Sequence, residues 1–368
     1  MSERDDDVDV DVEDEQPGDP AGEQPPADES KPRHRLRKAL IGLGVCVVLL
    51  IAGVFAVGLY LQNKLGDQID RIPDAFEGLE DRPQKSGDAV NILLMGSDRR
   101  SDKQTTGGDA TADSWIPGEQ RSDTLMVLHI SGDRESASVV SIPRDSYVRI
   151  PGHGEDKINA AFSYGGPSLA VETIEQLTSV HLDHIALIDW EGFERLTDAL
   201  GGVEVTVPET VRDTKNDRTW TKGKHELDGE EALLYVRQRY GLPGGDFDRI
   251  NRQQAFLRTL LGKTLSNDTL TSPTKLYDVL DAVTANLSVD EGWSVGDMRG
   301  LAWSLRGLRT SDVDFTTVPL KGTGMIGGAS VVLLDKPKGE RMWAAMRDDD
   351  FTTWMADHPD VGLPTKVR

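Results

Sequence analysis

Cysteine is almost absent from this chain of 368 residues, which contains a single one, Cys46. Because Cys46 lies inside a long apolar run near the N-terminus, the rest of the chain can form no disulfide of its own and must be held together by packing. Positive charge is also scarce, with 41 Lys and Arg against 63 Asp and Glu and a net charge of −22. A nucleic-acid partner would require a basic surface, so this balance argues against one.

Several common catalytic signatures are missing too. The sequence has no P-loop, no HExxH zinc motif and no CxxC pair. His181 and His184 are three residues apart and flank the start of an apolar segment, so a metal role for them is only a minor alternative. The chemistry is therefore sought among carboxylates and guanidinium groups.

One long apolar run stands near the N-terminus. Ala39 to Leu61 contains 23 residues without a charge; as a helix it would be about 35 Å long, against a hydrocarbon core of about 30 Å. We expect it to span a membrane. A buried core helix is the first alternative, but soluble helices are seldom apolar on every face over this length. A cleaved signal peptide is the second, but its apolar region would be shorter and would begin earlier.

The charges around this run predict its orientation. Five Lys and Arg precede it within Lys31–Lys38, whereas the charges that follow it nearly cancel. Basic residues remain on the cytoplasmic side, so we expect a single-pass protein of the cell membrane with its main domain outside. Met1 to Ser30 holds thirteen Asp or Glu and one Arg, a composition typical of a disordered tail.

Beyond the expected anchor, apolar segments of strand length alternate with segments of helical spacing. The strand candidates are Val90–Met95, Thr124–Ile130, Ser138–Ile142, Ile185–Ile188, Val203–Val207, Asp314–Val318 and Val331–Leu334. The helix candidates are Ser168–Val180, Trp190–Leu200, a helix opened by the capping pair Asp228 and Glu231, Asp248–Thr264, Pro273–Ala285, Val295–Leu308 and Lys338–Arg347. This alternation predicts one α/β domain with a central mixed sheet flanked by helices. The predicted division is a cytoplasmic tail (1–38), a transmembrane helix (39–61), a stalk (62–89), the folded domain (90–350) and a C-terminal tail (351–368).

Charged residues stand at the tips of three predicted strands. Asp98 follows one strand, Asp123 precedes the next, and Arg144 and Asp145 follow a third across Pro143. Ligand sites in open α/β sheets collect at strand ends. Each residue alone would more often form a turn or cap, but together they favour a site. Asp98 and Asp123 suit Mg²⁺, which prefers oxygen ligands and bridges phosphates.

A second group of charges is dense in arginine. Arg237 and Arg239 close one predicted helix, and Arg249 and Arg252 share a face of the next. Clustered guanidinium groups repel one another unless an anion lies among them, and their planar geometry suits phosphate oxygens. The alternative is a lattice of surface ion pairs with Asp246, Asp248 and Glu230.

The segments around these charges resemble the LytR–CpsA–Psr family of envelope proteins, in the family's order, over residues 90–261. The matching segments are NILLMGSDRR (Asn91–Arg100), RSDTLMVLHI (Arg121–Ile130), VVSIPRDSYVRIPG (Val139–Gly152), DKINAAFSYGGP (Asp156–Pro167), LIDWEGFERLTDALGGVEVTVP (Leu187–Pro208) and LDGEEALLYVRQRYGLPGGDFDRINRQQAFLRTLL (Leu227–Leu261).

The resemblance implies transfer of a glycopolymer from a polyprenyl diphosphate carrier to peptidoglycan through a phosphodiester link. It also implies a groove for the lipid, to which Phe162, Trp190 or Phe193 would contribute unless they belong to the core. By position, Asp98 and Asp123 match the family's Mg²⁺ carboxylates. Its diphosphate-binding arginines correspond to Arg121, Arg144, Arg237, Arg239 and Arg249, and further site positions to Lys157 and Asp246. The segment Ser101–Glu119 is a longer insertion than in many relatives.

The resemblance and these residues together predict a Mg²⁺-assisted, membrane-anchored phosphotransferase. The arginine-rich, acidic and glycine-rich composition suggests an actinobacterial envelope. We expect Arg144, Arg237 and Arg239 to act in catalysis, with Arg252 beside Arg249 in diphosphate binding. Either Asp98 or Asp145 would serve as the base. Two other classes stay open: a scaffold or regulator that binds wall glycan or carrier lipid without turnover, and a diphosphatase that hydrolyses the carrier link.

Overall fold

The computed structural model describes residues 69–99, 120–188, 190–364 and 367. These lie in the second of two compact units, Met1–Tyr60 and Leu61–Arg368. The expected acidic tail, the transmembrane helix 39–61 and the insertion 101–119 fall outside the described residues. Among the residues described, none of the helices is long and apolar enough to cross a membrane.

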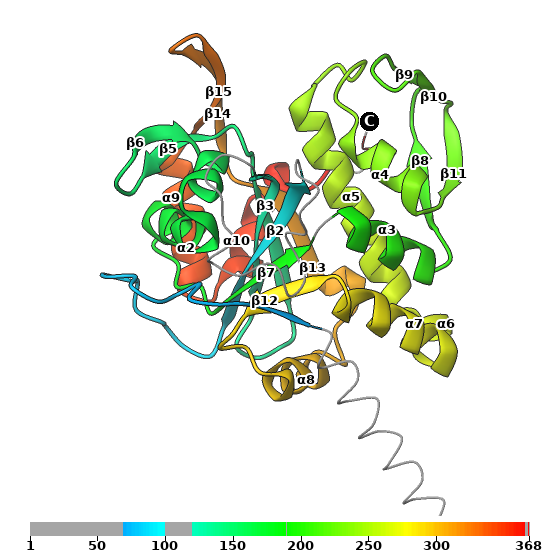
Figure 1. The fold of residues 1–368 in the computed structure, drawn as a ribbon, viewed down its shortest axis with the longest axis horizontal. Helices are drawn as coiled ribbons and strands as arrows, with labels where there is room; N and C mark the ends of the chain where they lie inside the picture. The colour runs from blue at the N-terminus through cyan, green and yellow to red at the C-terminus, as the bar shows by residue number, and fades with distance from the viewer. Residues whose placement is uncertain (1–68, 100–119, 189, 365–366, 368) are drawn as a thin grey trace, which may run out of the picture. The chain divides into compact units, whose positions relative to one another are not determined.

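A mixed sheet of seven strands forms the centre of the described domain (Figure 1). In spatial order its strands are β1 (Asp70–Ile72), β12 (Leu287–Asp290), β7 (His184–Ile188), β2 (Val90–Arg99), β3 (Gln120–Ile130), β4 (Ala137–Ile142) and β13 (Val313–Thr317). Strand β2 is parallel to β7, β4 is parallel to β13, and β3 runs antiparallel between β2 and β4. Strands β2, β4, β7 and β13 therefore all end at one edge of the sheet, called here the carboxyl edge, and β3 begins there.

Helices cover both faces of this sheet, which is why its strands are nearly continuous apolar runs. On one face, α2 (Asn159–Thr178), α9 (Lys336–Arg347) and α10 (Phe351–Asp357) pack on residues such as Leu93 and Val127. On the other, residues of α5 (Asp246–Thr264) and α8 (Val295–Ser304) pack on neighbours such as Ile92 and Met126. Successive strand residues thus serve opposite faces.

A further hydrophobic cluster lies beside the sheet. It is built from α3 (Trp190–Ala199), α4 (Gly229–Arg237), α5, α7 (Pro273–Thr284) and the paired strands β8 (Val203–Val207) and β11 (Gly223–Leu227). The smaller elements around these are β5 (Tyr147–Ile150), β6 (Gly154–Lys157), β9 (Val211–Asp213), β10 (Arg218–Trp220), β14 (Leu320–Ile326), β15 (Ala329–Leu334), α6 (Asn267–Leu270), η2 (Thr310–Asp312) and η3 (Pro359–Val361).

The α/β class and the central mixed sheet are confirmed, but the structure differs from the expected domain boundaries at both ends. Strand β1 lies within the expected stalk 62–89 and pairs with β12, and Ile72 and Ala75 belong to the core. Phe351, at the start of the expected C-terminal tail, is also buried in the core. Short segments such as Asp70–Ile72 are drawn into the fold by pairing partners more than 200 residues away, which local patterns do not reveal.

The helix expected at Asp228 is α4, and Asp228 is its N-cap. The carboxylate of Asp228 accepts a hydrogen bond from Glu231 N at 2.9 Å. The side chain of Glu231 pairs with Arg218. Half of the predicted capping box is therefore present, and Glu231 has been recruited to tie α4 to β10.

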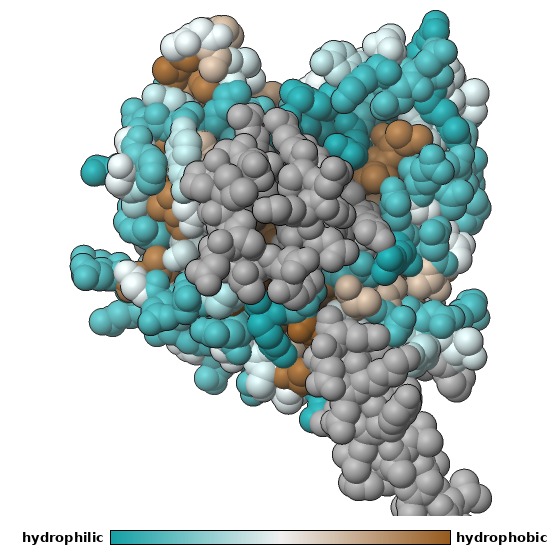
Figure 2. Space-filling model, viewed as in Figure 1, coloured by the Kyte–Doolittle hydropathy of each residue, from teal (hydrophilic) through white to brown (hydrophobic). Residues whose placement is uncertain are grey.

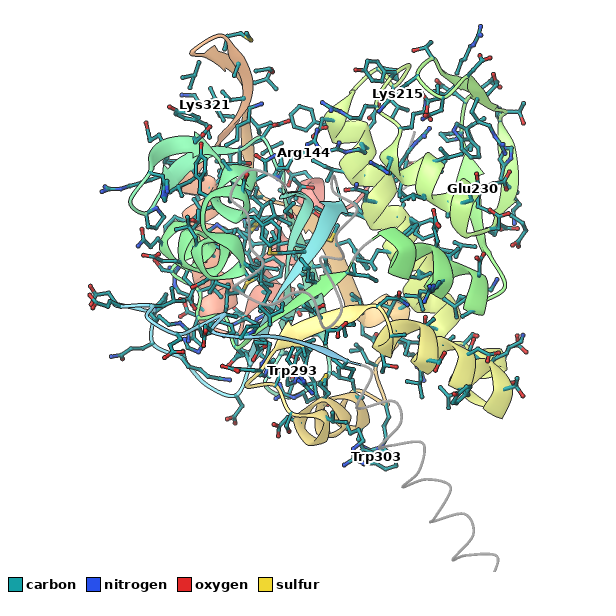
Figure 3. All side chains as sticks on the ribbon, in the orientation of Figure 1. Arg144, Lys215, Glu230, Trp293, Trp303 and Lys321 are labelled. Atoms are coloured by element: carbon teal, nitrogen blue, oxygen red, sulfur yellow. The ribbon has the colours of Figure 1, made fainter. Side chains whose placement is uncertain are left out.

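Replacing Asp228 with alanine should lower the free energy of unfolding by about 1 kcal/mol, because the cap satisfies an amide at the helix start. Chemical denaturation monitored by circular dichroism measures this. The matched control is Glu230→Ala, an exposed first-turn residue (Figure 3), for which we expect a change within about 0.5 kcal/mol. Equal losses in both variants would show that the cap is not the cause.

Candidate active site

Asp98 and Asp123 meet at the carboxyl edge. In the pairing of β2 with β3, Gly96 is opposite Thr124 and Ser97 is opposite Ser122, and the register shifts between them. Asp123 is therefore the extra residue of a β-bulge, and the pair Ser97 and Ser122 separates it from the pair formed by Asp98 and Arg121. Bulges redirect side chains and are frequent beside active sites. The side chains of Asp98, Arg121 and Asp123 lie outside the described part, but their backbones bring all three residues together.

The turn after β4 contributes a second charged group to this edge. The Asp145 carboxylate lies 3.0 Å from Lys157 Nζ and 3.9 Å from Arg144 Nε. Two backbone contacts fix this turn: Asn159 N donates to Arg144 O at 3.2 Å, and Val332 N donates to Asp145 O at 2.8 Å. Lys157, a site position that the resemblance implied, therefore lies beside Asp145, and its part in the reaction stays a prediction. An Asp145 that acted as base would have to release Lys157 first.

The arginines between α4 and α5 are organised by Asp246. Its Oδ1 lies 3.1 Å from Arg239 Nε and 2.9 Å from Arg249 Nη2. Arg249 is only 5% exposed at its side chain, Arg239 is 43% exposed, and Arg237 at the end of α4 is exposed. Asp246 thus forms ion pairs with these arginines, as the alternative of an ion-pair lattice expected. Asp248 has a different task, accepting from Gly244 N at 2.8 Å. One carboxylate shared by two guanidinium groups still leaves net positive charge for an anion.

Arg252 is completely buried and contacts protein groups. Its Nη1 donates to Gln238 Oε1 at 2.6 Å, and its guanidinium lies 4.2 Å from the centre of the Tyr235 ring. Burial lowers the pKa of Arg252, and the neighbouring Tyr235, Asp248 and Asp213 oppose that shift. Arginine nevertheless remains charged at neutral pH. Arg252 therefore holds the end of α4 against α5, and a direct contact with diphosphate stays a prediction.

Gln254 connects the arginine group to the carboxyl edge. Its buried Nε2 donates to Ser141 Oγ at 2.8 Å, to Thr316 O at 2.6 Å and lies 3.1 Å from Thr317 Oγ1. Ser141 and the two threonines stand at the ends of β4 and β13, and Arg144 follows three residues after Ser141. Arg249 precedes Gln254 by five residues, about 8 Å along the helix. In Figure 3 Arg144 lies between the sheet and α5. Gln254 was missed from the sequence; its only signal there is a polar residue amid the apolar positions of α5.

The expected lipid-groove aromatics are in part core residues. Phe162 is fully buried among the sheet and α2. Phe193 packs on Phe256 at 5.0 Å between ring centres. The side chain of Trp190 lies outside the described part. The core alternative is therefore correct for Phe162.

The two histidines have structural partners. His184 Nδ1 lies 3.1 Å from Asp290, and its ring stacks on Trp293 at 4.3 Å. His181 Nδ1 lies 2.9 Å from Pro83 O. Within the described ranges, no three His, Cys, Asp or Glu side chains are grouped so as to hold a metal ion.

Gly292–Gly296 has the letters of a GxSxG elbow, but its serine is a helix cap. Ser294 accepts from Asp297 N at 3.1 Å, donates to Asp297 Oδ2 at 2.6 Å, and has φ of −65°. A nucleophile elbow instead holds its serine in a strained turn. Ser294 is therefore not the nucleophile of such a site.

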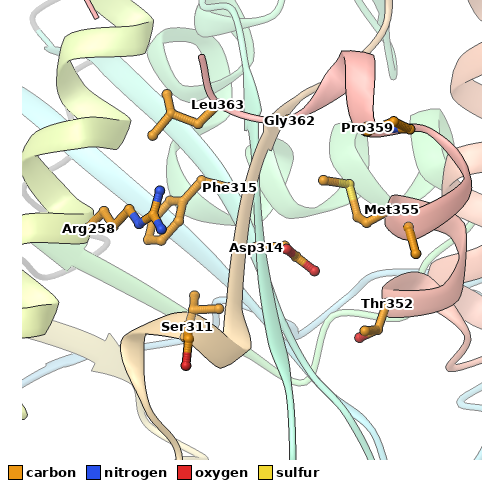
Figure 4. A pocket seen from close by; sticks show the side chains of 11 residues that line it. Arg258, Ser311, Asp314, Phe315, Thr352, Met355, Pro359, Gly362 and Leu363 are labelled. Carbon is orange, nitrogen blue, oxygen red and sulfur yellow. The ribbon is translucent and has the colours of Figure 1, made fainter. Parts of the chain in front are cut away.

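A cavity of about 370 Å³ lies away from these residues, between β13, α5 and α10 (Figure 4). Asp314 and Arg258 line it together with Thr352 and Met355. Burial raises the pKa of Asp314, and Arg258 opposes that shift. None of the predicted site residues lines this cavity.

Comparison with known proteins shows which family this chain is related to. Residues 62–348 match the model of the LytR_cpsA_psr family. This chain belongs to that family. The match includes the carboxyl edge, the arginines between α4 and α5, and also the segment that had been expected to be a stalk.

Two curated relatives and one solved structure illustrate the similarity. Cell wall biosynthesis protein LcpA of Corynebacterium glutamicum is 34% identical over 82% of this chain and 64% of its own length. This chain thus spans less than two thirds of that relative. The polyisoprenyl-teichoic acid–peptidoglycan teichoic acid transferase TagU of Enterococcus faecalis is 34% identical over 72% of this chain and 81% of its own. The solved structure of TagT bound to LIIa-WTA is 29% identical, with a TM-score of 0.54, over 71% of this chain and 91% of that one.

Proposed function

We propose that this LytR_cpsA_psr protein transfers a glycopolymer from a polyprenyl diphosphate carrier to peptidoglycan. The observation that carries the proposal is the bulged Asp123 beside Asp98 and Arg121, at the edge where Arg144 also stands and to which Gln254 ties α5. The names of TagU and TagT support it, because they describe transfer of teichoic acid and binding of LIIa-WTA.

The proposed reaction is a phosphoryl transfer. A sugar hydroxyl of the wall attacks the glycan-side phosphorus, forming a new P–O bond. The bond from that phosphorus to the bridging oxygen breaks, polyprenyl phosphate leaves with the electron pair, and a base accepts the hydroxyl proton. Such transfers depend mainly on positioning and charge neutralisation. The half-buried Arg144 and the nearly buried Arg249 are held by protein contacts in advance, as preorganised stabilisation requires.

The proposed metal is magnesium, held by Asp98 and Asp123. The backbone pairing puts Asp98 of β2 one pair beyond the bulge that contains Asp123 of β3, and carboxylate oxygens are the hard ligands that Mg²⁺ prefers. When bound, Mg²⁺ would supply neutralisation of the diphosphate charge. We expect chelation to suppress transfer, and Asp98→Asn to raise the Mg²⁺ concentration for half-maximal activity at least about tenfold. An unchanged Mg²⁺ dependence in Asp98→Asn would remove that residue from the metal site.

The proposed setting is the outer face of the cell membrane, with residues 39–61 as anchor and the cytoplasmic tail inside. The proposed partners are the lipid-linked donor and peptidoglycan, and no nucleic acid. This setting is supported by the charge-free run of 23 residues and the basic segment that precedes it.

Full-length protein in liposomes, given a fluorescent glycan on polyprenyl diphosphate and purified peptidoglycan, tests the proposal. We expect fluorescence to become covalently attached to the wall, with one polyprenyl phosphate released per glycan. Binding without turnover would favour the scaffold, and release of free glycan phosphate in the presence of wall would favour the diphosphatase. Either result would reject the transferase.

A further inference from the structure

The outer face of α8 carries a combination unusual for this acidic protein. Met298, Leu301 and Leu305 point to the hydrophobic cluster on the sheet. The opposite side bears the exposed residues Arg299, Ala302, Trp303, Arg306 and, past the helix end, Arg309. Between Met298 and Arg309 there are three arginines and no acidic residue, in a chain with a net charge of −22. We call these exposed residues, from Arg299 to Arg309, the α8 face.

Trp303 is the centre of this face. It is 71% exposed, the most exposed of the large hydrophobic residues in the described ranges. Arg306 lies over its ring, with Cζ 4.9 Å from the ring centre, and donates to Trp303 O at 2.9 Å. Figure 3 shows Trp303 on the outer side of α8, away from the sheet. An amphipathic ring beside guanidinium groups is typical of residues at the headgroup level of a membrane.

The chain enters the domain beside this face. Ile69, the first described residue, belongs to the hydrophobic cluster on which α8 packs. Arg71 Nη1 donates to Trp293 O at 2.5 Å, one residue before the N-cap of α8. Only seven residues separate Leu61 from Ile69, and the eight steps between them reach at most about 29 Å. An anchor ending at Leu61 would therefore keep α8 near the membrane.

The same entry point lies level with the middle of β2 (Val90–Arg99). Asp70 is in register with Ser288, Ser288 with Leu187, and Leu187 with Met95. Met95 is three residues before Asp98, so the chain enters three strands away from β2, about 14 Å.

We propose that the α8 face rests on the headgroup region of an anionic membrane, with Trp303 inserted and the three arginines paired with lipid phosphates. The inference rests on the proposed membrane location of the protein. It is independent of the transfer chemistry, because the α8 face contains none of the site residues. The arginines would strengthen the contact in proportion to anionic lipid, whereas the tryptophan would set its depth.

The test uses the full chain in liposomes with a nitroxide label at position 303, made as Trp303→Cys in a Cys46→Ser background. Met325, 70% exposed near the tip of β14, is the matched control as Met325→Cys because its exposure is nearly equal. In liposomes of phosphatidylcholine with phosphatidylglycerol, we expect the oxygen-to-nickel-chelate accessibility ratio to be several-fold higher at 303 than at 325. Replacing Arg299, Arg306 and Arg309 together with glutamine should remove the dependence of that ratio on phosphatidylglycerol.

Flotation of the labelled liposomes tests the membrane location of the protein separately from the contact of the α8 face. Protein that fails to float would overturn the membrane location and this inference with it, whatever the transfer assay shows. Protein that floats while position 303 is as accessible to water as position 325 would overturn only the α8 contact. A label at 303 that is immobilised without membrane depth would indicate a second copy of the chain on this face, and would also overturn it.

Discussion

Arg249→Ala is expected to reduce glycopolymer transfer by roughly 100- to 1,000-fold, the loss typical of one preorganised donor at a reacting centre. The Arg249 side chain is 5% exposed and held 2.9 Å from Asp246, so it is fixed before the donor arrives. Without Arg249 the diphosphate would lose a positioned positive charge. Water molecules could take the place of the guanidinium only by reorienting during the reaction. The reconstituted transfer assay measures the effect as the change in kcat/KM.

Two variants make this result interpretable. Arg258→Ala removes an exposed arginine from the same helix, away from the carboxyl edge, and should transfer at nearly the normal rate. Arg249→Lys keeps the charge but loses the planar fork, so an intermediate rate is expected. The assignment of Arg249 would be wrong if Arg249→Ala, still folded by circular dichroism, transferred glycan as fast as Arg258→Ala.

Arg252→Ala is expected to act on stability, lowering the free energy of unfolding by about 3 kcal/mol. The substitution empties a fully buried volume and leaves Gln238 Oε1 without its 2.6 Å partner, and both effects are costly. Urea denaturation of the full chain measures the loss, with Arg258→Ala as the exposed control expected within about 0.5 kcal/mol. Arg252→Met, which keeps most of the volume, should lose less than Arg252→Ala. A stable Arg252→Ala protein that had lost transfer would instead show that Arg252 contacts the donor.

The architecture of the sheet is largely predictable from sequence because its strands are buried on both faces. Val90–Met95 and Ser138–Ile142 are mainly apolar, with only Asn91, Ser138 and Ser141 polar, and the structure has β2 and β4 there. Helix signals based on capping were equally sound, as at Asp228 and α4. Short strands such as β1 and β12 escaped prediction because three or four residues carry no period of their own, and long-range pairing decides their state.

The residues of the candidate site could be named from the sequence, but the contacts that arrange them could not. Runs of charge at strand tips marked Asp98, Asp123 and Arg144, and arginine density marked Arg239 and Arg249. The bulge at Asp123 and the three contacts of Gln254 depend on register and packing between distant elements, which residue types do not encode locally. Similar residues also differ in their partners: Arg249 and Arg252 are both buried, but Arg249 pairs with Asp246 whereas Arg252 contacts Gln238 and Tyr235.

Native mass spectrometry of the detergent-solubilised full chain with a short polyprenyl diphosphate-linked glycan tests whether the carboxyl edge and the arginines of α5 bind the lipid diphosphate. We expect one donor bound per wild-type chain and per Arg258→Ala chain, and little or none bound to Arg249→Ala. Equal donor binding by all three proteins, or none by the wild type, would contradict this expectation.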